Sequence, residues 1–141
     1  MGLEMSLIEE NPSLLSNTES RLSNEEINTL LKKTLRLPRF RGVFPCDLIP
    51  KRMKWNEKAI VNTDPHFLPG LHYIAVCVRR RREILYFDPL NLNIERSFPT
   101  LFAVLKERNI TVIRALKSPI QAPSSKFCGF FCIEWLLSLL N

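Results

Sequence analysis

The sequence predicts an α+β domain in which helices pack on a mixed, mostly antiparallel sheet. Segments rich in β-branched and aromatic residues alternate along the chain with segments whose apolar residues recur at helical spacing. Two of the strand-like segments are joined by a link too short for a crossover, so they must pair antiparallel. The 141 residues suffice for one domain with one modest core. We assign residues 1–22 to a flexible polar tail and residues 23–141 to the domain.

The first helix is expected to begin at Ser23, which can cap it with Glu26 in the capping-box position. Its inner face is defined by residues at helical spacing, Ile27, Leu30, Leu31, Thr34 and Leu35. Pro38 should end this helix. Residues 39–45 are then expected to form a loop with buried aromatic side chains.

A short strand is expected at residues 59–62, followed by a longer strand at residues 71–78. The run of four arginines, residues 79–82, is interpreted as a solvated hairpin tip. No aromatic residues interleave with it, so a stacking surface for single-stranded nucleic acid is not indicated. The chain returns as a strand at residues 84–87.

This hairpin brings two polar residues together. His72 lies near the start of its first strand, and Asp88 follows the end of its second strand. Antiparallel pairing places these two positions side by side, at the end of the hairpin away from the arginines.

The remaining elements are a helix over residues 98–107, a third main strand over residues 110–116 and a terminal helix. A polar loop containing Pro123 precedes Cys128, and the apolar run from Phe130 to Leu140 follows it. We therefore expect Cys128 at the N-terminal end of a buried helix.

Cys128 is the candidate nucleophile. A thiol near the positive end of a helix dipole has a lowered pKa, and the thiolate is the reactive form. Gln121, seven residues upstream, is close enough for its side-chain amide to form an oxyanion hole with the Cys128 N–H. His72 would act as the base and Asp88 would orient it, which completes the minimum set for thiol catalysis on a carbonyl.

Other interpretations remain open. A cysteine in an apolar stretch is usually an inert core residue, which is our interpretation of Cys46, Cys77 and Cys132. Cys128 and Cys132 could hold zinc with His72 or His66, although their spacing differs from paired zinc knuckles. Asp64 could replace Asp88 as the acid, and the chain could instead be a basic module without catalysis.

The net charge of +6 is concentrated in residues 32–52 and in the arginine run. Such a balance attracts polyanions without implying sequence recognition. We expect no transmembrane helix, because no stretch of about twenty apolar residues occurs. The first residues do not resemble a secretory signal, so the four cysteines are expected to be reduced thiols inside a cell.

Four motifs, in this order, resemble the adenovirus maturation protease (adenain) family, which includes relatives in other DNA viruses and in virus-like transposons. They are Ala59-Ile60-Val61-Asn62-Thr63, Pro69-Gly70-Leu71-His72-Tyr73, Phe87-Asp88-Pro89-Leu90 and the block from Gln121 to Cys132. More distantly, the order of His, acid, Gln and Cys is similar to that of SUMO-deconjugating proteases.

The resemblance implies a papain-like core in permuted order and endopeptidase activity on virion precursor proteins, often after small or glycine residues. It implies His72 as base, Asp88 as orienting acid, Gln121 as oxyanion donor and Cys128 as nucleophile. It also implies a place in the host nucleus or virion. Alternatives are a protease that removes ubiquitin-like modifiers and an inactive, domesticated binding module.

The sequence departs from the family pattern in three places. Asp88 stands where glutamate is frequent, and Tyr73 where tryptophan is usual. Adenain is activated by DNA and by a peptide linked through a cysteine, but residues 108–111 contain no cysteine. We therefore expect no disulfide-linked activator. The chemistry is expected to require no cofactor or metal, and DNA is a candidate activator.

Overall fold

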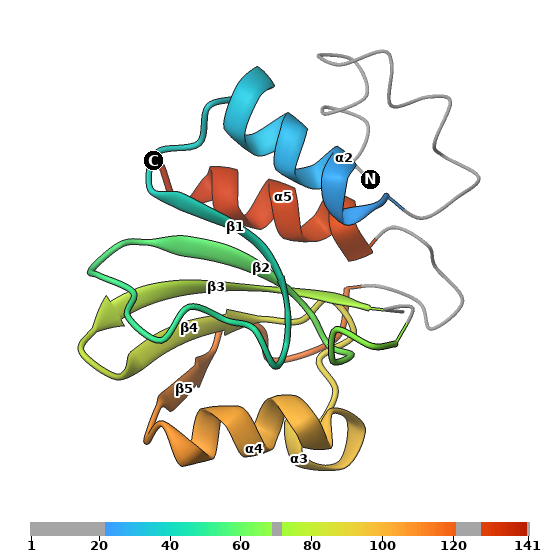
Figure 1. The fold of residues 1–141 in the computed structure, drawn as a ribbon, viewed down its shortest axis with the longest axis vertical. Helices are drawn as coiled ribbons and strands as arrows, with labels where there is room; N and C mark the ends of the chain where they lie inside the picture. The colour runs from blue at the N-terminus through green and yellow to red at the C-terminus, as the bar shows by residue number, and fades with distance from the viewer. Residues whose placement is uncertain (1–21, 69–71, 121–127, 141) are drawn as a thin grey trace.

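A computed structural model of the protein describes residues 22–68, 72–120 and 128–140, which form a central sheet with helices on both faces (Figure 1). The sheet has five strands in the order β1-β2-β3-β4-β5. They are β1 (Phe40–Pro45), β2 (Lys58–Asn62), β3 (Tyr73–Arg80), β4 (Glu83–Phe87) and β5 (Thr111–Arg114).

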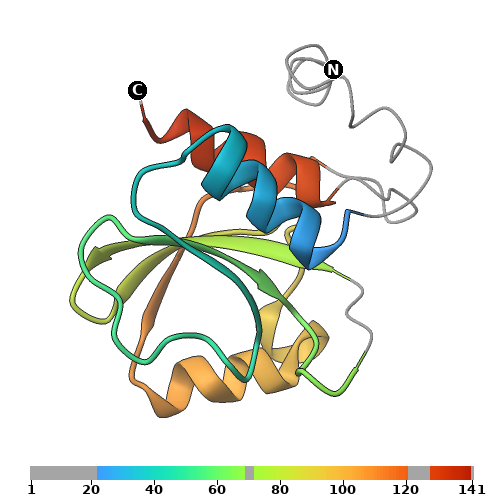
Figure 2. The same ribbon diagram turned by 45° about the horizontal axis from the view of Figure 1, so that its top comes forward.

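One face of the sheet is covered by α2 (Asn24–Thr29), its continuation as the π-helix η2 (Leu30–Thr34), and α5 (Cys128–Ser138). The other face is covered by α3 (Ile94–Ser97) and α4 (Pro99–Glu107), and both views of the ribbon agree (Figure 2). The α+β prediction is confirmed, and this layered arrangement agrees with a papain-like core.

The sheet is more evenly mixed than expected. The inner pairs, β2 with β3 and β3 with β4, are antiparallel, whereas both edge strands pair in parallel. Helices α3 and α4 lie between β4 and β5 in the chain. This helical connection carries the chain back to the end of the sheet at which β4 begins, so β5 runs parallel to β4.

The expected loop at residues 39–45 is wrong, since Phe40–Pro45 is the edge strand β1. Its partner is β2, further along the chain, so no short hairpin link marks the pairing in the sequence. The strand also contains a bulge between Phe40 and Gly42, and Gly42 has a φ of +140° that side-chain-bearing residues rarely adopt.

The predicted capping box at the first helix is confirmed. The Glu26 N–H donates to Ser23 Oγ at 3.1 Å, and the Ser23 N–H donates to Glu26 Oε1 at 2.9 Å. The helix then widens into η2, and Arg36 follows in the left-handed region with a φ of +49°. Leu22, which we placed in the tail, is buried in the core under α5.

The core is divided by the sheet into two clusters. The first packs the sheet against α2, η2 and α5, and the second packs it against α4. No helix among the described residues is long and apolar enough to cross a membrane.

Candidate active site

His72 and Asp88 lie in contact at one end of the β3–β4 hairpin, as the sequence predicted. His72 immediately precedes β3 and Asp88 immediately follows β4. The antiparallel register pairs Ala75 with Phe87, so the two polar residues share the same end of the sheet. The His72 Nε2 atom lies 2.6 Å from Asp88 Oδ1, and both side chains are buried.

The Asp88 carboxylate is oriented by the turn that follows it. The Leu90 N–H donates to Oδ1 at 2.9 Å, and the Leu92 N–H donates to Oδ2 at 3.0 Å. Aspartate commonly accepts such bonds from the backbone of a following turn, and the Asp-Pro pair was the signal that could have predicted it. Both oxygens are thereby occupied, which fixes the plane of the carboxylate facing His72.

The histidine is held by two residues that the sequence analysis missed. The backbone N–H of Thr63 donates to the His72 carbonyl at 2.9 Å, which anchors the chain beside the end of β2. The Phe98 ring stacks on the imidazole, with ring centroids 5.7 Å apart and planes 19° apart. These contacts leave the ring little freedom to rotate away from Asp88.

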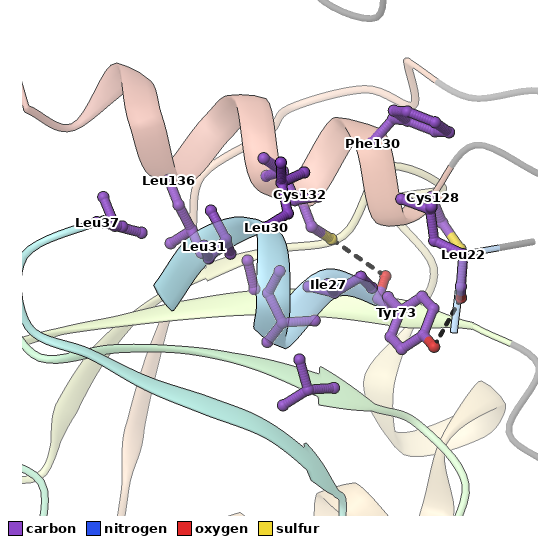
Figure 3. Packing of buried hydrophobic residues seen from close by; sticks show 14 of the residues in the cluster. Leu22, Ile27, Leu30, Leu31, Leu37, Tyr73, Cys128, Phe130, Cys132 and Leu136 are labelled. Carbon is purple, nitrogen blue, oxygen red and sulfur yellow. Dashed lines mark hydrogen bonds between the residues drawn. The ribbon is translucent and has the colours of Figure 1, made fainter. Parts of the chain in front are cut away.

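Cys128 is the first residue of α5 and is 2% exposed. Its neighbour one turn later, Cys132, donates its thiol hydrogen to the Tyr73 carbonyl at 3.4 Å (Figure 3). Since Tyr73 follows His72, this bond sets the start of α5 beside the histidine. The Cys128 side chain forms a hydrogen bond with the His72 side chain. Because Nε2 faces Asp88, Nδ1 is the imidazole nitrogen that is left to bond with the Cys128 thiol.

The electrostatics of the site favour a protonated His72. Burial lowers the pKa of His72, but hydrogen bonds and charge interactions with Asp88 and Cys128 outweigh burial and raise that pKa to about 9. An imidazolium between a carboxylate and a sulfur is the arrangement that stabilises a thiolate.

The next residue, Gly129, allows α5 to lie close to α2. A Cβ atom at this position would lie 3.3 Å from Ile27 Cδ1 and 3.6 Å from two atoms of Leu22. The first turn of α5 therefore packs directly on α2 and on Leu22, two residues before that helix (Figure 3).

Gln121, the fourth predicted site residue, lies outside the described residues. The preceding residue is described: the Ile120 N–H donates to the Pro89 carbonyl at 2.9 Å. The chain therefore passes beside the Asp88 turn just before it reaches Gln121.

The remaining cysteines are core residues, as predicted. Burial and two nearby aspartates raise the pKa of the Cys46 thiol to about 11. Burial also raises the pKa of Cys77 and that of Cys132. These thiols are therefore protonated at neutral pH, and their environments differ from that of Cys128.

Neither of the other polar candidates joins the site. His66 is half-exposed and pairs with Asp47, while the Asp64 carbonyl accepts a bond from Cys46 N–H. Asp88, and not Asp64, is therefore the partner of His72. Within the described ranges, no group of three or more His, Cys, Asp or Glu residues could hold a metal ion.

Comparisons with known proteins agree with this arrangement. The profile of the adenovirus endoprotease family matches residues 38–141, a range that contains His72, Asp88, Gln121 and Cys128. The chain is also 28% identical over 130 residues to a protein named "Protease" from Porcine adenovirus A serotype 3. That match covers 81% of this chain but only 62% of the relative's length. The family profile spans most of the chain, and the chain belongs to the adenovirus endoprotease family.

Proposed function

We propose that the chain is a cysteine endopeptidase of the adenain type, which cleaves structural precursor proteins of a virus or virus-like element during maturation. The observation that carries this proposal is the contact of one imidazole, that of His72, with both Asp88 and Cys128. Family membership supports the same chemistry. The place of action is then the virion or the host nucleus.

In the proposed mechanism, His72 takes the proton from the Cys128 thiol, and the thiolate attacks the carbonyl carbon of the scissile peptide bond. The carbonyl oxygen becomes an oxyanion, which the Gln121 amide and the Cys128 N–H stabilise. As the C–N bond breaks, His72 returns its proton to the departing amine and a thioester remains. His72 then deprotonates a water molecule that attacks this thioester, which releases the acid and restores the thiol.

Asp88 contributes by holding the imidazole in the tautomer and orientation that this proton transfer needs. The short distance to Nε2 and the two backbone N–H donors support this role. The chemistry needs no metal or cofactor.

DNA is the proposed activator. Its support is the net charge of +6 and an exposed aromatic residue among basic ones: the Trp55 side chain is 66% exposed and the Arg39 guanidinium lies 5.8 Å from its ring centroid. Basic and aromatic side chains together suit the phosphate backbone and bases of nucleic acid.

The test of the nucleophile is the rate at which iodoacetamide alkylates each cysteine as a function of pH, measured by mass spectrometry. Cys128 should react fastest, with an apparent pKa well below the roughly 8.5 of a free thiol, and His72→Ala should slow its reaction at neutral pH. Cys46 and Cys77 are internal controls in the same sample. A Cys128 no more reactive than these two would contradict the proposal.

The test of the substrate is a peptide cleavage screen with and without duplex DNA, at several salt concentrations. Endopeptidase activity that rises with DNA, and loses this rise as salt increases, is the expected result. A protease for ubiquitin-like modifiers would use the same four residues, so a folded modifier with a diglycine-linked extension is included. Cleavage of that substrate alone would replace the proposed function.

A further inference from the structure

A large cavity lies between the β3–β4 hairpin and α4. Helix α4 covers the face of the sheet opposite α5, which carries Cys128 (Figure 1). Its volume is about 860 Å³, which is within the usual range of about 300–1,000 Å³ for ligand pockets. Its floor is formed by buried side chains of the hairpin, and its wall by Leu101 and Leu105 of α4.

The inner part of this cavity contains a polar group without a partner. Tyr86 lines the cavity and is 2% exposed, and its hydroxyl has no hydrogen-bond partner among the described residues. Burial raises the pKa of Tyr86, so the hydroxyl is neutral and can donate. A buried unpaired hydroxyl costs about 1–3 kcal/mol, and a ligand oxygen at this position would remove that cost.

The mouth of the cavity is basic. Six cationic side chains line it against three acidic ones, and the cationic ones are Lys51, Arg52, Arg80, Arg81, Arg82 and Arg108. Arg108 also donates to the Ile49 carbonyl at 3.0 Å, which holds the loop that forms one side of the mouth. This excess of positive charge at the entrance favours an anionic group on the ligand.

The two ends are separated by an apolar stretch. On the hairpin, Val76 pairs with Tyr86 and Val78 pairs with Ile84, and the arginine tip follows. Tyr86 lies four residue positions after Arg82, which at about 3.3 Å per position along a strand is about 13 Å. The cavity therefore presents a positive entrance, an apolar passage and an inner hydrogen-bond donor, in that order.

We propose that this cavity binds a single-chain amphiphile, with its anionic group at the arginine-rich mouth and a hydroxyl or carbonyl oxygen at the Tyr86 hydroxyl. The apolar chain lies along the hairpin floor. The site is separate from the cysteine and does not depend on the proposed peptidase activity.

The probes are dodecanoate and 12-hydroxydodecanoate, both below the concentration at which they form micelles, with binding to the full chain measured by isothermal titration calorimetry. Both should bind, and the hydroxylated acid should bind about five-fold more tightly, because it supplies the missing partner of Tyr86. Tyr86→Phe should abolish that difference while leaving dodecanoate binding unchanged. Equal affinities of the two acids for the wild type, or no binding of either, would overturn the proposal.

The mouth is tested with a double variant that carries Lys51→Glu and Arg81→Glu. Its control is a second double variant, with Lys33→Glu and Lys117→Glu, which makes the same change of charge outside the cavity. The first should weaken dodecanoate binding at least about ten-fold, and the second should change it little. Equal weakening by both variants would indicate attraction by net charge alone and would overturn the site. Vesicles of anionic phospholipid distinguish the source of the ligand. If the site takes free acids, the protein binds dodecanoate and does not co-sediment with the vesicles. If the wild type co-sediments with the vesicles and the mouth variant does not, the ligand is a membrane lipid.

Discussion

The thiol of Cys132 donates to the carbonyl of Tyr73 across 3.4 Å, and this bond joins the second turn of α5 to the residue that follows His72. Both residues are buried. Tyr73 follows His72 directly, and Cys132 lies one helical turn after Cys128. The separation of Cys128 from His72 is therefore set by a contact between their neighbours.

Removing this contact should affect the reactivity of Cys128 as well as the stability of the fold. Cys132→Ala is expected to lower the free energy of unfolding by about 1–2 kcal/mol and to raise the pH midpoint of Cys128 alkylation. Cys46→Ala is the matched control, since Cys46 is equally buried but lies in the other cluster. It should reduce stability without moving that midpoint; an equal effect of both variants would contradict the positional role of Cys132.

Asp88→Asn should lower kcat/KM for peptide cleavage by about a hundredfold to ten-thousandfold. The single oxygen of an amide cannot accept both the hydrogen bond from His72 and that from the Leu92 N–H, which now go to different carboxylate oxygens. The amide therefore favours the wrong tautomer of the histidine. Asp64→Asn serves as the control and should leave the rate nearly unchanged. A loss with Asp64→Asn that matches the loss with Asp88→Asn would assign the effect to charge or folding.

The stability of the protein should depend on pH through His72. The folded pKa of about 9 lies above the ordinary value of 6.5, so the contribution of His72 is fully present below about pH 6.5 and is lost as the pH rises through 9. Urea unfolding of the wild type and of His72→Asn should therefore differ less at pH 9.5 than at pH 6, by up to about 3 kcal/mol. A difference that is constant or grows over this range would show that the folded pKa is not raised.

A larger side chain at Gly129 should separate α5 from α2. Gly129→Val is expected to cost about 1–3 kcal/mol, because its branches have no space beside Ile27 and Leu22. In Gly129→Ala the added Cβ is crowded by the flexible end of Ile27 at 3.3 Å, while its contacts with Leu22 at 3.6 Å are ordinary. The gain in helix propensity offsets the crowding, so the stability should stay within about 1 kcal/mol of the wild type. Thermal unfolding of the two variants measures this difference, and a valine as stable as the alanine would contradict the close packing.

The parts of the site predicted from sequence are those fixed by local geometry. The short link between β3 and β4 required antiparallel pairing, and that pairing placed His72 beside Asp88. The switch from a polar loop to an apolar run placed Cys128 at the start of a helix.

The parts that were missed depend on contacts between distant segments. Phe40–Pro45 becomes a strand only through its parallel partner β2, and Phe98 reaches His72 only because α4 packs on the far face of the sheet. Neither relationship leaves a local pattern in the sequence. The pairing of Asp88 with the backbone of Leu90 and Leu92 was local, and a turn-based interpretation of Asp-Pro would have found it.

The order of the elements has a consequence for synthesis. All five strands, and with them His72 and Asp88, precede α5 in the chain. Synthesis from the N-terminus therefore produces all the residues of the sheet before Cys128, so the histidine and its carboxylate are present in the nascent chain before the thiol. The thiol reaches the histidine only when α5 packs on the finished sheet.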